Sequence, residues 1–323
     1  MDFKTAGRII EQELEKYPFE SSPAELYEPV KYIISLGGKR LRPAITLMAC
    51  SIFSDAVQNS LKPALAFEIF HNFTLLHDDL MDNSGIRRGN ETVHIKWNPN
   101  TAILSGDVMS ILAYKILSES PQDILPDLLQ LFNTTALEVC EGQQWDMNFE
   151  SRSDVSVEEY LRMIELKTAV LLAASLKSGA LAGGANQLES DLLYEFGRHL
   201  GIAFQIRDDY LDVFGDTEVF GKKIGNDILT DKKTFLLIKA LELSEGKTRE
   251  ELLGWLEKKE HDPSRKITGV SQIFSSLELD RISTELATSH YEKAMHFLDR
   301  VDAPVERKAP MAEMAKTLMA REN

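Results

Sequence analysis

The sequence predicts an all-α protein, and two observations support this fold class. Apolar residues recur three and four positions apart through nearly every segment, which is the period of a helix face. No run of alternating apolar and polar residues convincingly indicates a strand. Eleven prolines are few for 323 residues, and no linker rich in proline, glycine or serine divides the chain. Length alone allows one large domain or two, and these observations favour a single domain over residues 1–323.

The expected helices follow one another, separated by proline and by turns that contain glycine. Several segments are apolar almost all round, as is typical of central helices in a large bundle. A further helix is expected to begin near Pro43, because proline suits the first turn of a helix. A final helix is expected within residues 309–323. In order, the segments with the clearest helical period are residues 6–17, 61–82, 108–119, 124–147, 156–184, 191–215 and 234–245.

Charge and cysteine content narrow the function classes. A formal net charge of −15 argues against broad electrostatic binding to nucleic acid or to an anionic membrane. Cys50 and Cys140 have no metal-ligand spacing and form no disulfide framework, which favours a reduced, cytoplasmic setting. The most apolar run, residues 168–185, is interrupted by Lys177, and the first residues lack a signal-peptide core. We therefore expect a soluble protein without a membrane span.

Two acid motifs of the form D-D-x-x-D lie on apolar helical segments, at residues 78–82 and 208–212. Residues four apart project from the same face of a helix, so Asp78 points with Asp82, and Asp208 with Asp212. A lone motif of this kind is most often a solvated acidic face. If two such apolar helices faced each other, six carboxylates would surround one cavity, which requires cations. Mg²⁺ is the best candidate, because it takes oxygen ligands and shares its remaining positions with substrate phosphates.

Basic residues follow both acid motifs and also a Gly-Gly turn. Guanidinium groups and lysines suit phosphate oxygens, and amides at a helix start add donors. Each residue alone is most simply a surface charge, but together they suit a diphosphate held by Mg²⁺ on one side and by cations on the other. These residues are Lys39, Arg40, Arg42, Arg87, Arg88, Lys222, Lys223, Lys232 and Lys233.

Six motifs stand in a fixed order along nearly the whole chain. They are GGKRLRP (37–43), EIFHNFTLLHDDLMD (68–82) with RRG (87–89), GQQWD (142–146), KTA (167–169), FQIRDDYLD (204–212) and GKKIGNDI (221–228). In this order they resemble the trans-type isoprenyl diphosphate synthases, also called polyprenyl synthetases. The resemblance implies an isoprenoid-synthase bundle of ten or more helices around a deep central cavity, in a homodimer, with the two acid-rich helices facing each other across the cavity mouth.

The same resemblance implies an enzyme, a prenyltransferase that joins isopentenyl diphosphate head-to-tail to an allylic diphosphate. An allylic cation would develop, the double bond of isopentenyl diphosphate would attack it, and a proton would be lost. The released diphosphate is the implied base. Mg²⁺, three ions when diphosphate is bound, would bridge the allylic diphosphate and neutralise the leaving group. The implied partners are these two substrates.

The resemblance also assigns roles to individual residues. Mg²⁺ would be bound by Asp78, Asp82 and Asp208, supported by Asp79, Asp209 and Asp212. The allylic diphosphate would be held by Arg87, Lys167, Thr168, Gln205 and Lys222, with Lys232, Gln143 and Asp146 as further members of the cavity. Isopentenyl diphosphate would be bound by Lys39, Arg42, His71 and Arg88. The catalytic set would be Asp78, Asp82, Arg87, Lys167, Asp208 and Lys222. Counting back from IGNDI selects Lys223 in place of Lys222; we take Lys222.

Two histidines and the product length need separate treatment. His71 alone is typical of a core histidine, and the resemblance gives it a substrate-side role; His77 is expected to be structural. In this family, bulky residues about one turn before the first acid motif form the cavity floor. Phe73, five residues before Asp78, resembles short-chain synthases that make C15 to C20 products, and favours C20. A helical wheel, however, places Thr74 nearer the Asp78 stripe, so the two arguments disagree about the floor.

Three other functions compete with this interpretation. Class I terpene cyclases share the fold and first motif, but their second motif mixes Asn or Asp, Ser or Thr, and Glu, whereas this one is DDYLD. An HD-type phosphohydrolase would use His77 and Asp78 but leave the second acid motif unexplained. A non-catalytic partner subunit is expected to have degraded acid motifs, and both are intact.

Overall fold

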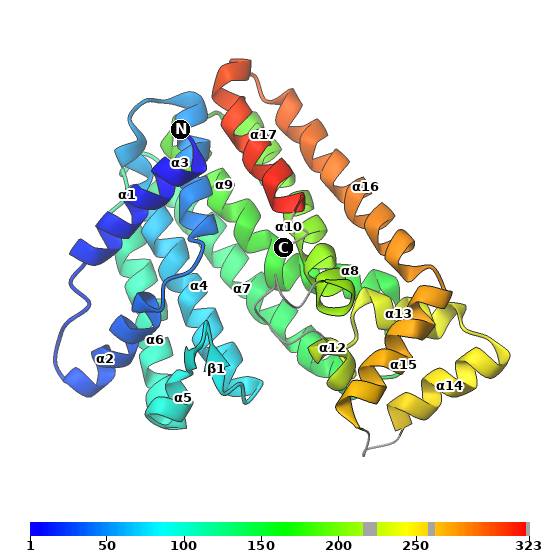
Figure 1. The fold of residues 1–323 in the computed structure, drawn as a ribbon. Coiled ribbons are helices and arrows are strands. Elements are labelled where there is room, and N and C mark those ends of the chain that lie inside the picture. The colour runs from blue at the N-terminus through cyan, green and yellow to red at the C-terminus, as the bar shows by residue number, and fades with distance from the viewer. Residues whose placement is uncertain (216–224, 258–261, 321–323) are drawn as a thin grey trace. The chain divides into compact units, whose positions relative to one another are not determined.

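The computed structural model describes residues 1–215, 225–257 and 262–320. These residues are almost entirely helical, which confirms the predicted fold class (Figure 1). They divide into two compact units. The first comprises Met1–Thr134, Ala174–Tyr194 and Val301–Met314, and the second comprises Thr135–Ala173, Glu195–Arg300 and Ala315–Asn323, the last of which is described as far as residue 320. The single domain over 1–323 stays a prediction.

The first unit is built mainly from helices in the N-terminal part of the chain. Its elements are α1 (Phe3–Lys16), α2 (Ala24–Ser35), α3 (Leu41–Phe53), the 3-10 helix η1 (Val57–Ser60), α4 (Leu61–Met81), α5 (Val93–Lys96) and α6 (Pro99–Leu117). A short antiparallel hairpin, β1 (Ile86–Arg87) with β2 (Asn90–Glu91), follows α4. The sequence does not predict this hairpin, because two residues are too few to show an alternating pattern.

The second unit contains most of the remaining helices. They are α8 (Val157–Ile164), the π-helix η2 (Glu165–Ala169), α12 (Asn226–Leu229), α13 (Phe235–Leu243), α14 (Gly246–Glu257), α15 (Pro263–Ser276) and α16 (Leu279–Arg300). Four helices contribute residues to both units: α7 (Leu125–Glu150), α9 (Val170–Ala182), α10 (Gln187–Phe214) and α17 (Val305–Met319). The single helix expected over 156–184 is thus α8, η2 and α9 in succession.

Helix α4 is the central element of the first unit. It packs against α3 and α6 (Figure 1). Its buried residues lie on all sides between Pro63 and Phe70, which explains the apolar pattern of this part, and from Asn72 to Asp79 they lie on one face. Phe67 and Phe70 both pack against Phe132 of α7, with ring centroids 5.3 and 5.1 Å apart. This aromatic packing holds the helix whose last turn carries the first acid motif.

The second unit has its own core around α8, α10, α13 and α15. Tyr160, Ile206, Phe235 and Phe274 are almost completely buried in it. The capping box of α8, in which Ser156 and Glu159 bond to each other's backbone N–H, fixes the start of the helix that carries Tyr160. None of the described helices is both long and apolar enough to cross a bilayer.

Candidate functional site

The first acid motif lies at the carboxyl end of α4. Asp78 and Asp79 occupy its last turn, and Asp82 follows the helix directly. The Asp79 side chain is only 3% exposed and the Asp78 side chain 21%, while Asp82 is exposed. The two residues predicted to share a face are therefore the accessible ones, and the middle aspartate is buried in the unit.

Asp79 is held by Arg87 from the hairpin. The Arg87 Nε donates to Oδ1 at 3.0 Å and Oδ2 at 3.2 Å, and Nη2 donates to Oδ1 at 2.5 Å. Nη2 also lies 3.8 Å from Asp78 Oδ2. Burial raises the pKa of Asp79, and the Arg87 guanidinium opposes this rise. The planar guanidinium donates to both oxygens of the carboxylate, so it fixes the orientation of Asp79 and compensates its charge.

The hairpin turn explains why neighbouring arginines point to different partners. Arg87 pairs with Asn90, which leaves Arg88 and Gly89 as a two-residue loop with positive φ angles of 53° and 76°. Two positive φ angles are typical of the type I′ turn that closes tight hairpins. The Arg88 guanidinium donates to the carbonyl of Gly37. A Cβ at Gly38, where φ is 134°, would lie 2.7 Å from Arg88 Cζ, so this Gly-Gly turn makes room for the arginine.

The predicted isopentenyl-side residues gather around α3 and α4 of the first unit. Arg42 Nη1 donates to His71 Nε2 at 3.1 Å. Because arginine has no acceptor, Nε2 accepts and the neutral imidazole carries its proton on Nδ1. Burial lowers the pKa of Arg42 to about 10, and burial followed by Arg42 lowers the pKa of His71 well below its ordinary value. His71 is therefore a neutral donor at physiological pH and Arg42 remains a cation.

Arg40 has a structural role that the sequence did not separate from its neighbours. Its Nε donates to Glu11 at 2.8 Å and its Nη1 to Glu68 at 2.7 Å, and the arginine side chain is 4% exposed. Glu68 also accepts from Asn72 Nδ2 at 3.0 Å. Arg40 is thus bound to the carboxylates of two helices, α1 and α4, and is removed from the group of phosphate-binding candidates.

The second acid motif lies near the end of α10 in the second unit. Asp208 and Asp212 are half-buried, and Asp209 is buried. The Tyr160 hydroxyl donates to Asp209 Oδ2 at 2.6 Å, and Gln205 Nε2 donates to Oδ1 at 2.8 Å. Gln205 Oε1 in turn accepts from the Thr168 hydroxyl at 3.2 Å. As in the first motif, the middle aspartate is fixed by protein donors.

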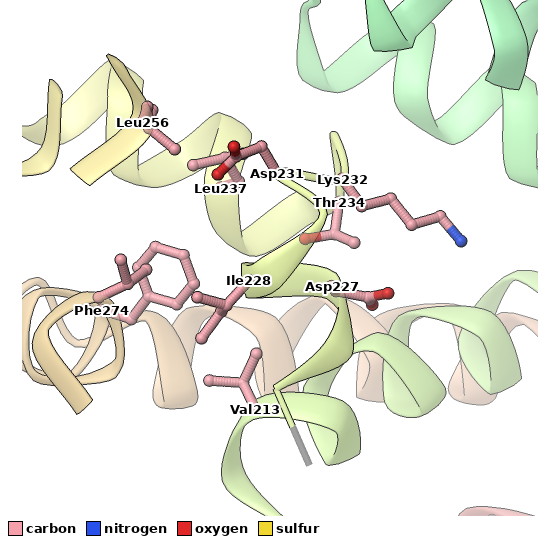
Figure 2. Close-up of a pocket in the computed structure, with 10 residues that line it drawn as sticks. Val213, Asp227, Ile228, Asp231, Lys232, Thr234, Leu237, Leu256 and Phe274 are labelled. Atoms are coloured by element: carbon pink, nitrogen blue, oxygen red, sulfur yellow. The ribbon is translucent and has the colours of Figure 1, made fainter. Parts of the chain in front are cut away.

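Asp212 connects α10 to the short helix α12. Its Oδ2 accepts from the backbone N–H of Asp227 at 2.9 Å, and its carbonyl accepts from the N–H of Gly225 at 2.6 Å. Burial raises the pKa of Asp227; Lys232 opposes this rise, and Asp209 and Asp212 add to it. Figure 2 shows Asp227 and Lys232 extending away from Ile228, Val213 and Phe274, whose apolar side chains line a small pocket. Asp227 is thus a further carboxyl of this acid cluster.

The change Asp227→Asn is expected to stabilise the ligand-free protein more at higher pH. A buried carboxyl with a raised pKa makes the folded state bind more protons than the unfolded state, so its contribution to stability falls as pH rises above the ordinary aspartate range. Asparagine does not titrate, so the stability difference between variant and wild type should grow by on the order of 1 kcal/mol between about pH 5 and about pH 8. Urea unfolding at both pH values measures it, and a pH-independent difference would contradict the prediction.

The π-helix η2 presents Lys167 and Thr168. Lys167 Nζ lies 2.6 Å from Asp146 Oδ2 of α7. A Cβ at Gly142 would lie 2.3 Å from the backbone nitrogen of Lys167, so only glycine lets α7 approach η2 this closely. Gln143 Nε2 is buried without a hydrogen-bond partner among the described residues. These contacts bring the GQQWD and KTA motifs together.

The remaining predicted residues are four lysines, Phe73 and Thr74. Lys222 and Lys223 lie outside the described residues. Lys39 and Lys232 are exposed. The Phe73 ring lies between Phe70 and His77 on α4, with centroids 5.4 and 4.8 Å away, whereas the Thr74 hydroxyl donates to the carbonyl of His71 at 2.8 Å. Which of the two forms the cavity floor stays a prediction.

The sequence did not single out Tyr160 or Asp227, and Glu68 entered only as a letter of a motif. Asp227 belongs to the motif GKKIGNDI, so the resemblance alone could have added it to the acid cluster. Tyr160 contacts Asp209 from another helix, 49 positions away in the sequence. No local pattern connects residues that are so far apart, and only the folded unit reveals this contact.

The carboxylates present fit Mg²⁺. Within the described part of the chain, no three His, Cys, Asp or Glu side chains converge closely enough to hold a metal ion by themselves. Mg²⁺ needs no such cage, because it commonly takes one or two carboxylates and completes its shell with water and substrate phosphates. Asp78, Asp82 and Asp208 offer partly accessible oxygen donors of this kind. The facing arrangement of the two acid-rich helices stays a prediction.

An all-helical fold with two D-D-x-x-D motifs and an arginine-histidine cluster defines a class of proteins built to handle diphosphates. Comparison with known proteins agrees with this class. Residues 23–273 match the polyprenyl synthetase family. The geranylgeranyl diphosphate synthase of Methanosarcina mazei is 45% identical over 222 residues, or 68% of each chain. A crystal structure of a geranylgeranyl pyrophosphate synthase superimposes with a TM-score of 0.94, at 41% identity and complete coverage of both chains.

A third relative is named for a different product. The geranylfarnesyl diphosphate synthase of Natronomonas pharaonis is 37% identical over 236 residues, which cover 68% of this chain and 69% of that protein. The chain belongs to the polyprenyl synthetase family. This confirms the resemblance inferred from the six motifs and leaves product length as the open question.

Proposed function

We propose that this protein is a Mg²⁺-dependent prenyltransferase that condenses isopentenyl diphosphate head-to-tail with an allylic diphosphate to make a short-chain, all-trans prenyl diphosphate. One observation carries the proposal. In each acid motif the middle aspartate is fixed by protein donors, Arg87 for Asp79 and Tyr160 with Gln205 for Asp209, while the first aspartate keeps an accessible carboxylate. Such paired carboxylates suit a metal-bound diphosphate, and family membership supports the reaction.

The proposed reaction breaks the bond between C1 of the allylic substrate and its diphosphate oxygen. Asp78, Asp82 and Asp208 would hold Mg²⁺, which when bound supplies positive charge that stabilises the departing diphosphate. Arg87, Lys167 and Lys222 would add positive charge beside the same leaving group. The double bond of isopentenyl diphosphate then forms the new carbon–carbon bond between its C4 and this C1, which leaves positive charge at its C3. The released diphosphate would take a proton from C2, and the electrons of that C–H bond form the product double bond between C2 and C3.

Isopentenyl diphosphate, the second substrate, would bind at Arg42, His71 and Arg88 of the first unit. Arg42 and Arg88 would pair with the diphosphate of isopentenyl diphosphate, and His71 would donate a hydrogen bond as a neutral imidazole. The depressed pKa of His71 matters here, because a histidine that holds its proton on Nδ1 serves as a donor without adding a charge. Lys39, which is exposed, would contribute a further positive charge.

We take the product to be geranylgeranyl diphosphate, C20. The aromatic Phe73 before the first motif supports this length, and relatives named for C20 products support it further. The relative named for geranylfarnesyl diphosphate makes C25 the principal alternative.

The homodimer is also a proposal: Leu104 and Ile111 of α6 are 57% and 67% exposed, and a second copy would cover them. Sedimentation equilibrium distinguishes dimer from monomer.

A product assay tests the function directly. Purified protein with Mg²⁺ and isopentenyl diphosphate would receive C5, C10 and C15 allylic diphosphates in turn. Growth of each starter to one predominant length, C20, is the expected result. No elongation from any starter, with diphosphate release from the C10 or C15 substrate alone, would instead indicate a terpene cyclase or a phosphohydrolase.

A further inference from the structure

The side chain proposed to limit product length is supported from one side by an imidazole. The His77 ring meets the Phe73 ring edge-on, with centroids 4.8 Å apart and planes inclined by 67°. Phe70 lies on the other side of Phe73, at 5.4 Å. The three rings lie on α4, so the orientation of Phe73 is limited by one neighbour at each side.

The His77 ring is itself fixed by α6. Its Nε2 lies 3.2 Å from the carbonyl oxygen of Ile103. A carbonyl only accepts, so Nε2 carries the proton and donates. A Cβ built at Gly106 would lie 2.2 Å from this same nitrogen, so the imidazole occupies the space that any side chain at this position would fill. Gly106 of α6 and His77 of α4 thus form an interlocking contact.

We infer that His77 is a positioning residue for product length: seated against Gly106 and Ile103, it keeps the Phe73 ring in place against the growing prenyl tail. The inference rests on the proposed function and deepens it. Burying each added isoprene unit is favourable, so the prenyl tail enters any apolar space that opens when a side chain moves aside. A floor of one phenylalanine ring resists this only while the ring has no alternative position, and the His77 imidazole occupies the neighbouring space on one side.

The test compares product lengths at equal substrate conversion, not rates. His77 adjoins Asp78, so a change in turnover alone would not discriminate a structural effect from a positioning one. With His77→Ala we expect the ratio of C25 to C20 product to rise about ten-fold, in line with the loss of one aromatic neighbour. His77→Phe keeps a ring beside Phe73 and should retain most of the wild-type ratio. Met81→Ala, at a residue of α4 that is 47% exposed, is the matched control and should leave the ratio unchanged.

Gly106 provides a second route to the same contact. The methyl group of Gly106→Ala must displace the imidazole, so this variant is expected to change the product ratio although it lies on another helix. In Gly106→Ala/His77→Ala the methyl meets no imidazole, and the product pattern should equal that of His77→Ala alone. Circular dichroism and thermal unfolding establish that each variant is folded.

The outcomes separate the inference from the proposed function. If wild type elongates no starter, the proposed function fails. If wild type elongates but His77→Ala or Gly106→Ala yields the wild-type product ratio, the positioning role of His77 is wrong while the synthase stands. If His77→Ala loses all turnover, the ratio from Gly106→Ala decides the inference in the same way.

Discussion

Replacing Asp78 or Asp208 by alanine is expected to lower prenyl transfer at least about a hundred-fold while the helical fold persists. Both carboxylates are partly accessible, and each begins a motif whose middle aspartate is already occupied by protein donors. The variants should therefore lose activity because they bind the metal-bound diphosphate less well, and not because their packing is disturbed. Steady-state kcat/KM reports the loss in activity, and calorimetric titration with Mg²⁺ and inorganic diphosphate reports the loss in binding.

A matched control keeps this test specific. Asp123→Ala removes an exposed carboxylate outside both motifs and should change neither quantity. Near-normal transfer in either Asp78→Ala or Asp208→Ala would show that the proposed metal site is wrong. An unfolded variant would be recognised by its circular dichroism.

The second large effect concerns stability. Arg87→Ala is expected to lower the free energy of unfolding by about 3 kcal/mol, because it leaves the buried Asp79 carboxylate without its cation. Urea unfolding measures the change. Adding Asp79→Asn to this variant removes the uncompensated charge and should recover part of the stability. Arg87→Ala alone should also transfer prenyl groups more slowly, since Arg87 is proposed to bind the leaving diphosphate.

Arg281 offers a comparison on the surface of the second unit. It contacts two carboxylates, Glu278 at 2.7 Å and Glu285 at 2.8 Å, yet its side chain is 55% exposed. Exposed ion pairs contribute little, so Arg281→Ala should lower the free energy of unfolding far less than Arg87→Ala does. Equal losses from Arg87→Ala and Arg281→Ala would mean that burial of Asp79 does not determine the cost.

The sequence predicted the fold class and the acid motifs because both depend on local spacing. Helical period places apolar residues on a face, and an interval of four places Asp78 with Asp82. Spacing could not reveal which aspartate of each motif is buried. That depends on Arg87, delivered by a two-residue hairpin turn, and on Tyr160 from a separate helix.

The sequence also could not divide the basic residues by role. Arg40 and Arg42 stand two positions apart, yet one is bound to two glutamates and the other donates to His71. The difference arises from the backbone: Arg40 has a φ of 45°, in the left-handed region, and precedes the first residue of α3. Composition reports a cluster of cations, and only the turn geometry assigns each cation to its partner.

The π-helix at Glu165–Ala169 imposes a constraint on chain length as well as on residue type. It holds more residues per turn than the α-helices before and after it. Deleting a single residue there would restore a regular helix. The residues beyond it would keep nearly the same direction, because the π turn accommodates one extra residue, but the side chains within the turn would be displaced by one position. Lys167 would then turn away from Asp146, and Thr168 from Gln205. The directions of Lys167 and Thr168 therefore depend on the number of residues in this turn as well as on their types.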